Sequence, residues 1–395
     1  MHEPKLWTRD FLIDSITNLF VYLAYYFLIV TITLYAMDNL QASPSEAGLA
    51  CGIFILGALL ARVFAGKVID RIGRKKTLYG GLIFYLVTTL LYFGVTSLPL
   101  LVVIRFLHGA GFGISATATG TIVASIIPDE RRGEGTSYYA LSVTLASAIG
   151  PFLGMFLIQQ GSFNLILILT VALLAACLVG VSFLRVPEAE LTVEQVNKMK
   201  GFALDNFFET KAIPISLIGL FVGLGFSSIL GFITSFARES NLVGAGSFFF
   251  IVYAVAILIS RPLTGRWFDQ RGENVVMYPS FLVFALGLFV LSQARLGIFL
   301  LLAAALIGFG YGTFMSSAQA ISVKVSPRHR MGLATSTFFS LIDGGVGVGP
   351  FLLGFLIPLV GFRGVYICMA VVVFACSFLY YFLHGRTVKQ NEQRT

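Results

Sequence analysis

The sequence predicts an all-α membrane protein whose twelve transmembrane helices form two pseudo-symmetric bundles of six. Its 395 residues are 57% hydrophobic and 12% charged, with a mean hydropathy of +0.88. A soluble domain, by contrast, is about half apolar and a quarter charged. Apolar stretches of about 20 residues, the length that crosses a bilayer, recur along the chain. The pattern also repeats at one constant offset, which predicts the two halves.

Twelve apolar segments are long enough to cross a bilayer. Their even number places both termini on the same side of the membrane. The first is about 25 residues long and exceeds the roughly 7 to 15 apolar residues of a cleaved signal peptide, so we expect it to remain in the mature protein. The predicted spans are residues 11–36, 45–66, 77–96, 99–127, 136–158, 163–185, 212–236, 246–265, 275–293, 297–323, 333–358 and 362–384.

Lysine and arginine gather in alternate loops. Most of the 27 basic residues lie on the side of the termini, whereas the opposite side has only Arg238, Arg295 and Arg363. The positive-inside rule therefore predicts that both termini are cytoplasmic, and we expect a multi-pass protein of the inner (cytoplasmic) cell membrane. Since topology accounts for the basic residues, the net charge of +8 does not indicate a nucleic-acid partner.

The cysteines and most histidines show no metal-ligand pattern. The cysteines lie in apolar segments without C-x-x-C spacing, and three histidines lie near loops or chain ends. No G-x-x-x-x-G-K-[ST] loop occurs, so we expect no ATP hydrolysis. We therefore expect no cofactor, and a proton gradient as the source of energy. The residues concerned are Cys51, Cys177, Cys368, Cys376, His2, His329 and His384.

The longest polar break, from Pro187 to Lys211, separates the two halves of the chain. We expect an N-terminal six-helix bundle at residues 1–186, a cytoplasmic linker at 187–211 and a C-terminal six-helix bundle at 212–395. Within the linker, Thr192-Val193-Glu194-Gln195 has the spacing of a capping box, which predicts a short surface helix.

The two halves repeat each other without gaps. Moving the first half forward by 199 positions places Arg62 on Arg261 and Gly66 on Gly265. A duplicated six-span unit is an architecture of secondary transporters. The same shift aligns Asp70 with Asp269, Gly73 with Gly272, Gly109 with Gly308, Gly111 with Gly310, Gly113 with Gly312, Pro128 with Pro327, Arg131 with Arg330, Gly133 with Gly332, Ser137 with Ser336, and Gly150–Leu153 with Gly349–Leu352.

Two motifs resemble signatures of the major facilitator superfamily, and the resemblance covers essentially the whole chain. The loop between spans 2 and 3 reads Gly66-x-x-x-Asp70-Arg71-x-Gly73-Arg74-Lys75, and a weaker copy lies at Gly265–Gly272. Span 4 contains Arg105-Phe106-Leu107-His108-Gly109-Ala110-Gly111, an arginine followed by a Gly-rich turn. The family's drug exporters often have glutamine at the position of His108.

Two further segments are similar to the exporter branch of that family. Span 5 keeps the end of the antiporter signature, Ala146-x-x-x-Gly150-Pro151-x-x-Gly154, although an earlier glycine is missing and Met155 takes the final position. The span 11 segment Asp343–Pro350 resembles arabinose-efflux-type and opine-metallophore exporters. The resemblance implies a twelve-span drug/proton antiporter.

In the family that the chain resembles, spans 1, 4, 7 and 10 line the central cavity. Polar and aromatic residues form stripes on these spans, and span 8 adds a tyrosine. A lining of aromatic, methionine and amide side chains suits amphiphilic organic substrates. The cavity-lining candidates are Asn18, Tyr22, Tyr25, Phe112, Ser115, Phe226, Ser227, Tyr253, Tyr311, Met315 and Gln319.

Four of the ionisable residues within the spans are functional candidates, because a charge there costs at least about 2.5 to 3.5 kcal/mol. Helical spacing puts Arg105 and His108 on one face of span 4, where they can couple protons or contact an anion. Asp343 in span 11 and Asp14 in span 1 are candidates for carrying a proton. Structural alternatives stay open: Arg105 can bond backbone carbonyls, and Asp14 can interact with the positive end of its helix.

Two other features are expected to be structural. Ser43, Pro44 and Glu46 have the spacing of a capping box at the start of span 2. The run Gly109–Gly113 lies within an apolar span, so we expect its small residues to allow close packing between helices.

The basic loop after span 2 and its copy after span 8 are predicted to form a two-fold cytoplasmic gate. The glycines permit a tight turn. We expect the carboxylate of Asp70 to meet positive partners or helix N-termini when this side is closed, and arginines of the loop can pair with acidic residues of the neighbouring loop. The gate candidates are Gly66, Asp70, Arg71, Gly73, Arg74, Asp269, Asp129 and Glu130.

The sequence thus predicts a monomeric, proton-coupled exporter of small organic or amphiphilic molecules that works by alternating access in the bilayer. Two alternatives stay open. Uptake by symport of an organic anion attracted to Arg105 differs in the direction of flux, and a lipid flippase would have a lateral opening between the bundles. An enzyme is not expected, because no His/Asp/Ser constellation lies on one face. A membrane sensor is not expected either, because no soluble signalling domain is found.

Overall fold

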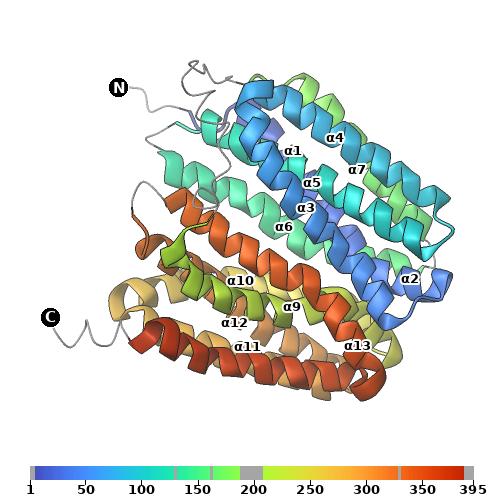
Figure 1. The fold of residues 1–395 in the computed structure, drawn as a ribbon, viewed down its shortest axis with the longest axis vertical. Coiled ribbons are helices and arrows are strands. Elements are labelled where there is room, and N and C mark those ends of the chain that lie inside the picture. The colour runs from blue at the N-terminus through green and yellow to red at the C-terminus, as the bar shows by residue number, and fades with distance from the viewer. Residues whose placement is uncertain (1–4, 129–130, 161–162, 187–207, 328–330, 387–395) are drawn as a thin grey trace. The chain divides into compact units, whose positions relative to one another are not determined.

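The computed structural model describes residues 5–128, 131–160, 163–186, 208–327 and 331–386, and the regular structure within these ranges is helical (Figure 1). The predicted all-α membrane class is confirmed. The elements are α1 (Arg9–Ile29), α2 (Ile32–Leu40), α3 (Pro44–Ile72), α4 (Arg74–Leu91), η1 (Tyr92–Gly94), α5 (Leu98–Ile126), α6 (Arg132–Gln159), α7 (Phe163–Ser182), η4 (Thr210–Ala212), α9 (Ile213–Glu239), α10 (Val243–Arg271), α11 (Glu273–Gln293), α12 (Gly297–Lys324), α13 (Met331–Tyr380) and η6 (Tyr381–Gly385).

The chain divides into two compact units, Met1–Gln41 with Ile53–Gly201, and Ala42–Gly52 with Phe202–Thr395. The start of α3 therefore groups with the second unit. It does so because Gly52 approaches α13 so closely that a Cβ atom there would overlap the carbonyl oxygen of Gly347. The surface helix predicted at Thr192–Gln195 lies outside the described residues.

Eleven helices of the described chain are long and apolar enough to cross a membrane. The last of them contains a turn at Gly361, whose φ of 68° interrupts the helical backbone of α13. This turn lies between the predicted spans 333–358 and 362–384. The twelve predicted crossings therefore all correspond to described helices.

The first predicted span contains two helices. Within residues 11–36, α1 ends at Ile29 and α2 begins at Ile32. Between them, the hydroxyl of the buried Thr31 donates to the carbonyl oxygen of Phe27 at 2.8 Å. Such side-chain bonds compete with the backbone ladder and bend helices. The span therefore has a break inside it that hydropathy does not predict.

The structure reproduces the repeat of the sequence at the end of each second span. α3 ends before Gly73, whose φ is 103°, and α10 ends before Gly272, whose φ is 83°. A positive φ is strained for any residue with a Cβ atom, so both turns require glycine. The two turns lie 199 positions apart, as the repeat predicts.

The Gly-rich runs of α5 and α12 pack closely against neighbouring helices. A Cβ atom on Gly109 would overlap the carbonyl oxygen of Phe54, and one on Gly308 would overlap that of Tyr253. The predicted role of these glycines in close helix packing is confirmed. The repeat holds for these contacts as well: Phe54 of α3 packs against α5, and Tyr253, 199 positions later in α10, packs against α12.

The predicted capping box at the start of α3 is present. The carboxylate of Glu46 accepts from the backbone N–H of Ser43 at 2.8 Å, and the Ser43 hydroxyl accepts from the backbone N–H of Glu46 at 3.4 Å. These bonds satisfy two N–H groups that the first turn leaves without helical partners.

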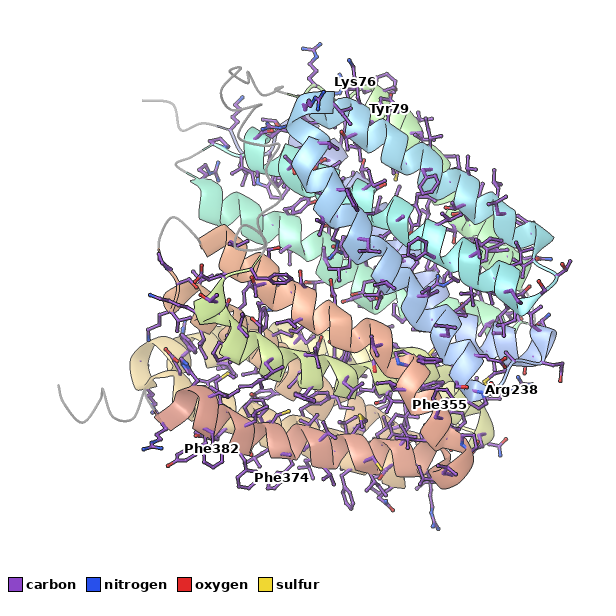
Figure 2. The ribbon with its side chains drawn as sticks, viewed as in Figure 1. Lys76, Tyr79, Arg238, Phe355, Phe374 and Phe382 are labelled. Atoms are coloured by element: carbon purple, nitrogen blue, oxygen red, sulfur yellow. The ribbon has the colours of Figure 1, made fainter. Side chains whose placement is uncertain are left out.

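Large apolar side chains cover the outward faces of the helices. Phe374 and Phe382 are 44% and 70% exposed and project outward from the last span, whereas Lys76 lies in the first turn of α4 (Figure 2). In water such a surface would be an aggregation hazard, but in a bilayer it faces lipid chains. The protein is thus a multi-pass membrane protein.

Candidate functional site

A stripe of polar and aromatic side chains on α5 is buried in the first unit. Arg105, His108, Ser115 and Thr119 are fully buried, and Phe112 is 3% exposed. They are spaced three or four positions apart and so lie on one face of α5, which is the face that helical spacing predicts for Arg105 and His108. An arginine buried in a membrane-crossing helix requires partners that offset the loss of water.

Arg105 finds two of these partners within the first unit. Its guanidinium carbon lies 4.5 Å from the centre of the Phe54 ring in α3, and one N–H donates to the hydroxyl of Tyr92 in η1 at 3.4 Å. The face of an aromatic ring attracts a cation most strongly where water is excluded.

His108 continues this network with a defined direction. The hydroxyl of Thr89 donates its proton to the carbonyl oxygen of Tyr85 at 2.8 Å. Its contact of 3.0 Å with Nε2 of His108 therefore requires that Nε2 be the donor. In the neutral ring Nδ1 is then the acceptor, and it receives the hydroxyl of Tyr92 at 3.4 Å. A directed chain runs from Arg105 to α4, and it holds His108 in one tautomer.

A second buried cluster joins α1, α5 and α6. The Asn18 amide oxygen accepts from the Thr119 hydroxyl at 3.0 Å, and its N–H donates to the Ser142 hydroxyl at 2.7 Å. Ser142 in turn donates to the carbonyl oxygen of Tyr139 at 2.6 Å. The hydrogen bonds thus form a chain from Thr119 through Asn18 to Ser142.

Asp14 lies one helical turn before Asn18 on α1 and takes no part in this chain of hydrogen bonds. The residue is fully buried, and neither carboxylate oxygen has a hydrogen-bond partner among the described residues. Burial of a carboxylate without partners costs several kcal/mol.

Three aromatic rings from α1, α3 and α5 form a stack in the first unit. The ring of Tyr25 lies 5.2 Å from that of Phe54 and 5.1 Å from that of Phe112, centre to centre, and is nearly parallel to both. The guanidinium carbon of Arg62 lies 5.6 Å from the centre of Phe112. The stack is therefore flanked by two guanidinium groups, with Arg105 at Phe54 and Arg62 at Phe112.

The second unit contains a related stack. Phe226 of α9 lies 4.1 Å from Tyr311 of α12 and 5.6 Å from Tyr253 of α10, with nearly parallel rings. Tyr253 and Tyr311 are the repeat partners of Phe54 and Phe112. Each unit thus has one stack, built from its first, second and fourth spans. The two stacks contain the sequence candidates Tyr25, Phe112, Phe226, Tyr253 and Tyr311.

The model of the Major Facilitator Superfamily matches residues 15–244 and 215–395. The chain belongs to the major facilitator superfamily. It is a transporter of that family and not an enzyme. As a member, it is similar to the staphylopine export protein of Staphylococcus aureus, with 26% identity over 360 residues that cover 86% of this chain and 88% of the relative. The multi-drug resistance efflux pump PmrA of Streptococcus pneumoniae is 25% identical over 372 residues, 87% of this chain and 88% of the pump.

Solved structures of the superfamily share the fold of this transporter. The nucleoside transporter NupG aligns with a TM-score of 0.76 over 95% of this chain and 99% of that chain, at 13% identity. A bacterial homologue of the human lysosomal transporter Spinster, inward-facing and unoccupied, aligns with a TM-score of 0.76 over 97% and 98% of the two chains, at 14% identity.

Asp343 and the other candidates of the second unit have mixed surroundings. Asp343, Met315 and Gln319 of the transporter are half-buried. Ser227 is fully buried, and its hydroxyl donates to the carbonyl oxygen of Leu224 at 2.6 Å. After Asp343, a Cβ atom on Gly344 would meet open space, whereas one on Gly345 would overlap the backbone of α9.

An ion-pair cluster of the transporter was missed by sequence reasoning. The buried carboxylate of Glu273 in α11 accepts from Lys324 at 2.6 Å and pairs with His384 of η6 at 2.5 Å. Next to it, the amide of Asn274 donates to the carbonyl oxygen of Gly385 at 3.2 Å. In the first unit Lys75, 199 positions earlier, donates to the carbonyl oxygens at the end of span 6. The repeat aligns Lys75 with Asn274 but does not align the residues that they contact, so no sequence signal pointed to this cluster.

The predicted gate is described only in part. Gly66 has open space around its Cα atom, and Arg71 is exposed at the end of α3. The turn itself is present at Gly73, followed by the half-buried Arg74. The side chains of Asp70 and Asp269, and the residues Asp129 and Glu130, lie outside what the structure describes. The gate therefore stays a prediction.

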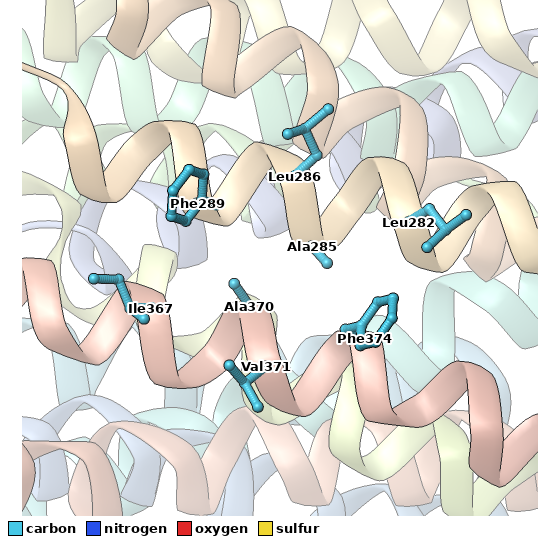
Figure 3. A pocket seen from close by; sticks show the side chains of 8 residues that line it. All are labelled: Leu282, Ala285, Leu286, Phe289, Ile367, Ala370, Val371 and Phe374. Atoms are coloured by element: carbon cyan, nitrogen blue, oxygen red, sulfur yellow. The ribbon is translucent and has the colours of Figure 1, made fainter.

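An apolar groove of about 370 Å³ lies between α11 and the second half of α13 (Figure 3). The groove is open where the small side chains of Ala285 and Ala370 lie, and larger apolar side chains surround it. The groove contains none of the predicted site residues. Its lining is Leu282, Ala285, Leu286, Phe289, Ile367, Ala370, Val371 and Phe374.

Proposed function

We propose that this transporter exports small amphiphilic organic molecules in exchange for protons by alternating access. One observation carries the coupling: Asp14 is a carboxyl group buried in a membrane-crossing helix without a hydrogen-bond partner among the described residues. The names of the relatives, a staphylopine export protein and a multi-drug efflux pump, support the outward direction. The distribution of lysine and arginine supports an inner-membrane protein with cytoplasmic termini.

In this proposal the proton is carried by Asp14 or by Asp343. An ionised carboxylate buried without partners is unfavourable by several kcal/mol. Each opening of the bundle to water therefore changes the cost of charging Asp14, and such a difference between two conformations is what coupling requires. Asp343 is half-buried beside the open side of Gly344, where a cationic group of the substrate can compete with the proton.

The two aromatic stacks provide the substrate contacts. The half-buried rings of Tyr22 and Tyr25 at the first stack offer apolar contact to planar groups of many shapes. The half-buried Met315 and Gln319 add a flexible apolar contact and a hydrogen-bonding amide. A lining of this kind favours breadth over strict selection, in line with multi-drug relatives.

One alternative is favoured by a specific observation. Arg105 and Arg62 place two positive charges against the stack of the first unit. A transporter that takes up an organic anion together with protons would use the same charges. The direction of flux separates the two functions.

Everted membrane vesicles with an acidic interior test direction and coupling together, with ethidium and staphylopine as probes. An exporter accumulates a probe inside these vesicles and releases it when nigericin collapses the pH gradient. Failure of both probes to accumulate, or accumulation that survives the collapse, would overturn the proposal. The variants Asp14→Asn and Asp343→Asn then identify the coupling residue. Replacement of that residue should stop gradient-driven accumulation, while exchange of labelled for unlabelled probe continues.

A further inference from the structure

The side chain of Arg62 points towards the aromatic stack, although the membrane–water interface is within its reach. It lies one helical turn before Gly66, where the apolar part of α3 ends. From such a position an arginine normally extends to the interface and keeps its charge in water. In an α-helix, however, side chains lean towards the N-terminus, which directs Arg62 back along α3 into the first unit. Its guanidinium carbon lies 5.6 Å from the centre of Phe112, and the residue is half-buried.

The duplication supplies an internal comparison for this arrangement. Arg261 occupies the same position in α10, but its side chain is exposed. The ring that corresponds to Phe112 is Tyr311, which stacks on Phe226 at 4.1 Å. The helix position itself therefore does not require an inward guanidinium. The inward arginine is a property of the first unit, which indicates a role beyond the architecture shared by both halves.

The surroundings of Arg62 suit a flat molecule with an anionic group. Tyr25 stacks on Phe112, and Tyr22 meets the same ring edge-on at 5.1 Å. Ring faces bind an aromatic group, and a planar guanidinium binds a carboxylate through two parallel hydrogen bonds. Tyr22 and Tyr25 are half-buried, so this part of the stack is more open than Phe54.

Arg105 does not offer the same contact. It is fully buried behind Phe54, and it starts the directed chain of hydrogen bonds through Tyr92. Its charge adds to the positive potential of the stack, while its guanidinium is held in place. The two arginines therefore divide the work: Arg105 organises the buried network, and Arg62 faces the more open end of the stack.

We propose that Arg62 binds the anionic group of the transported molecule, and that the substrates include aromatic or heteroaromatic carboxylates whose ring lies against Tyr22 and Tyr25. This inference rests on the proposed function, because it assigns the substrate class of the same site. It does not depend on the direction of transport or on the coupled ion.

Binding to the purified full-length transporter tests the proposal without any transport step. The probes are two matched pairs, indole-3-acetate with indole-3-acetamide and naphthalene-1-acetate with its amide, measured by calorimetry and by thermal shift. Within each pair only the charge and the second oxygen differ. Loss of a charge-assisted pair of hydrogen bonds is worth about 10- to 100-fold in affinity. We expect each carboxylate to bind at least about tenfold more tightly than its amide.

The variants assign this preference to one residue. Arg62→Gln should remove the preference for the carboxylates, Arg62→Lys should keep part of it because the charge remains, and Arg261→Gln should leave it unchanged. Size-exclusion chromatography and circular dichroism establish that each variant is folded, and Arg62→Lys carries the test if Arg62→Gln is not. Equal binding of acid and amide by the unaltered protein, binding of neither, or an Arg62→Lys or folded Arg62→Gln protein with the full preference would overturn the proposal. Failure of the vesicle experiment alone would instead overturn export or coupling.

Discussion

The guanidinium carbon of Arg105 lies 4.5 Å from the centre of the Phe54 ring, and neither side chain is exposed. The ring face stabilises the cation where water cannot. From one N–H of the guanidinium a directed chain of hydrogen bonds runs through Tyr92 and His108 to Thr89. Arg105 thus joins α3, η1, α4 and α5 into one buried polar network, which leads to specific expectations.

Replacement of Arg105 by lysine is expected to lower the stability of the transporter by about 2 kcal/mol, because an ammonium group cannot both lie flat on Phe54 and reach Tyr92. Thermal unfolding in detergent measures the effect. Arg261→Lys is the control: its side chain is exposed, so a change of less than about 0.5 kcal/mol is expected. An Arg105→Lys protein as stable as the original would contradict the stacking argument.

Thr89 and Thr88 provide a matched pair for the tautomer of His108. Thr89→Val leaves the Nε2–H donor of His108 without an acceptor and should cost about 1 to 3 kcal/mol. Thr88 is equally buried, but its hydroxyl bonds only to backbone carbonyls one turn earlier, so Thr88→Val should cost less than about 1 kcal/mol. Thermal unfolding of both variants makes the comparison, and equal losses would refute the assigned donor.

Asp14→Asn is expected to leave thermal stability unchanged or slightly raised, because neither oxygen of Asp14 has a hydrogen bond to lose among the described residues. Gradient-driven accumulation in everted vesicles should nevertheless fall at least about tenfold. Asp10 on the same helix is the control: its carboxylate accepts from the backbone N–H of Arg185 at 2.9 Å. Asp10→Asn should therefore cost about 1 kcal/mol and leave coupling intact. The reverse pattern would exclude Asp14 as the coupling residue.

Glu273 is expected to matter more for stability than Lys324. Glu273→Gln removes the charge that pairs with Lys324 and replaces one of the carboxylate oxygens that contact Lys324 and His384, and it should destabilise the protein by about 1 to 3 kcal/mol. Lys324→Met should cost less than about 1 kcal/mol, because the lysine side chain is 67% exposed and the solvent screens its pair. Urea or thermal unfolding measures the stability of both variants. A Glu273→Gln protein as stable as the original would show that packing alone holds η6 to α11.

The glycines of α5 should differ sharply although they lie in one helix. A methyl group on Gly109 would overlap the carbonyl oxygen of Phe54, so Gly109→Ala should force α5 away from α3 and lower the yield of folded protein. Gly120 has open space at the same point, and Gly120→Ala should be neutral or stabilising by up to about 1 kcal/mol. Expression level and thermal unfolding compare the two. A well-folded Gly109→Ala protein would rule out the close contact as a packing constraint.

The stripe on α5 could be predicted from residues 105 to 119 alone, because helical periodicity puts side chains three and four positions apart on one face. The residues that this stripe contacts could not be predicted. Thr89 and Tyr92 belong to the preceding span, and no sequence spacing relates them to His108. Polar residues in an apolar span were the available signal, but periodicity does not say which neighbouring helix they meet.

The break between α1 and α2 was also beyond the reach of hydropathy. Residues 11–36 are predominantly apolar, and Thr31 differs little from its neighbours on that measure. Only the bond from its hydroxyl to Phe27 reveals the end of α1. Hydropathy reports transfer into the bilayer, which is insensitive to how the backbone bends within it.

The sequence by itself determined the crossings, the duplication and the turns at Gly73 and Gly272, because bilayer insertion and backbone sterics act on each segment separately. Only the tertiary structure decided that Arg62 faces Phe112 whereas Arg261 is exposed, and that Asp14 takes no part in the chain of hydrogen bonds through Asn18. Those outcomes depend on which side chains from other helices are within reach. They are therefore set by packing between segments that are distant in the sequence. The repeat gives the two halves the same helices, but the individual residues that meet between those helices differ.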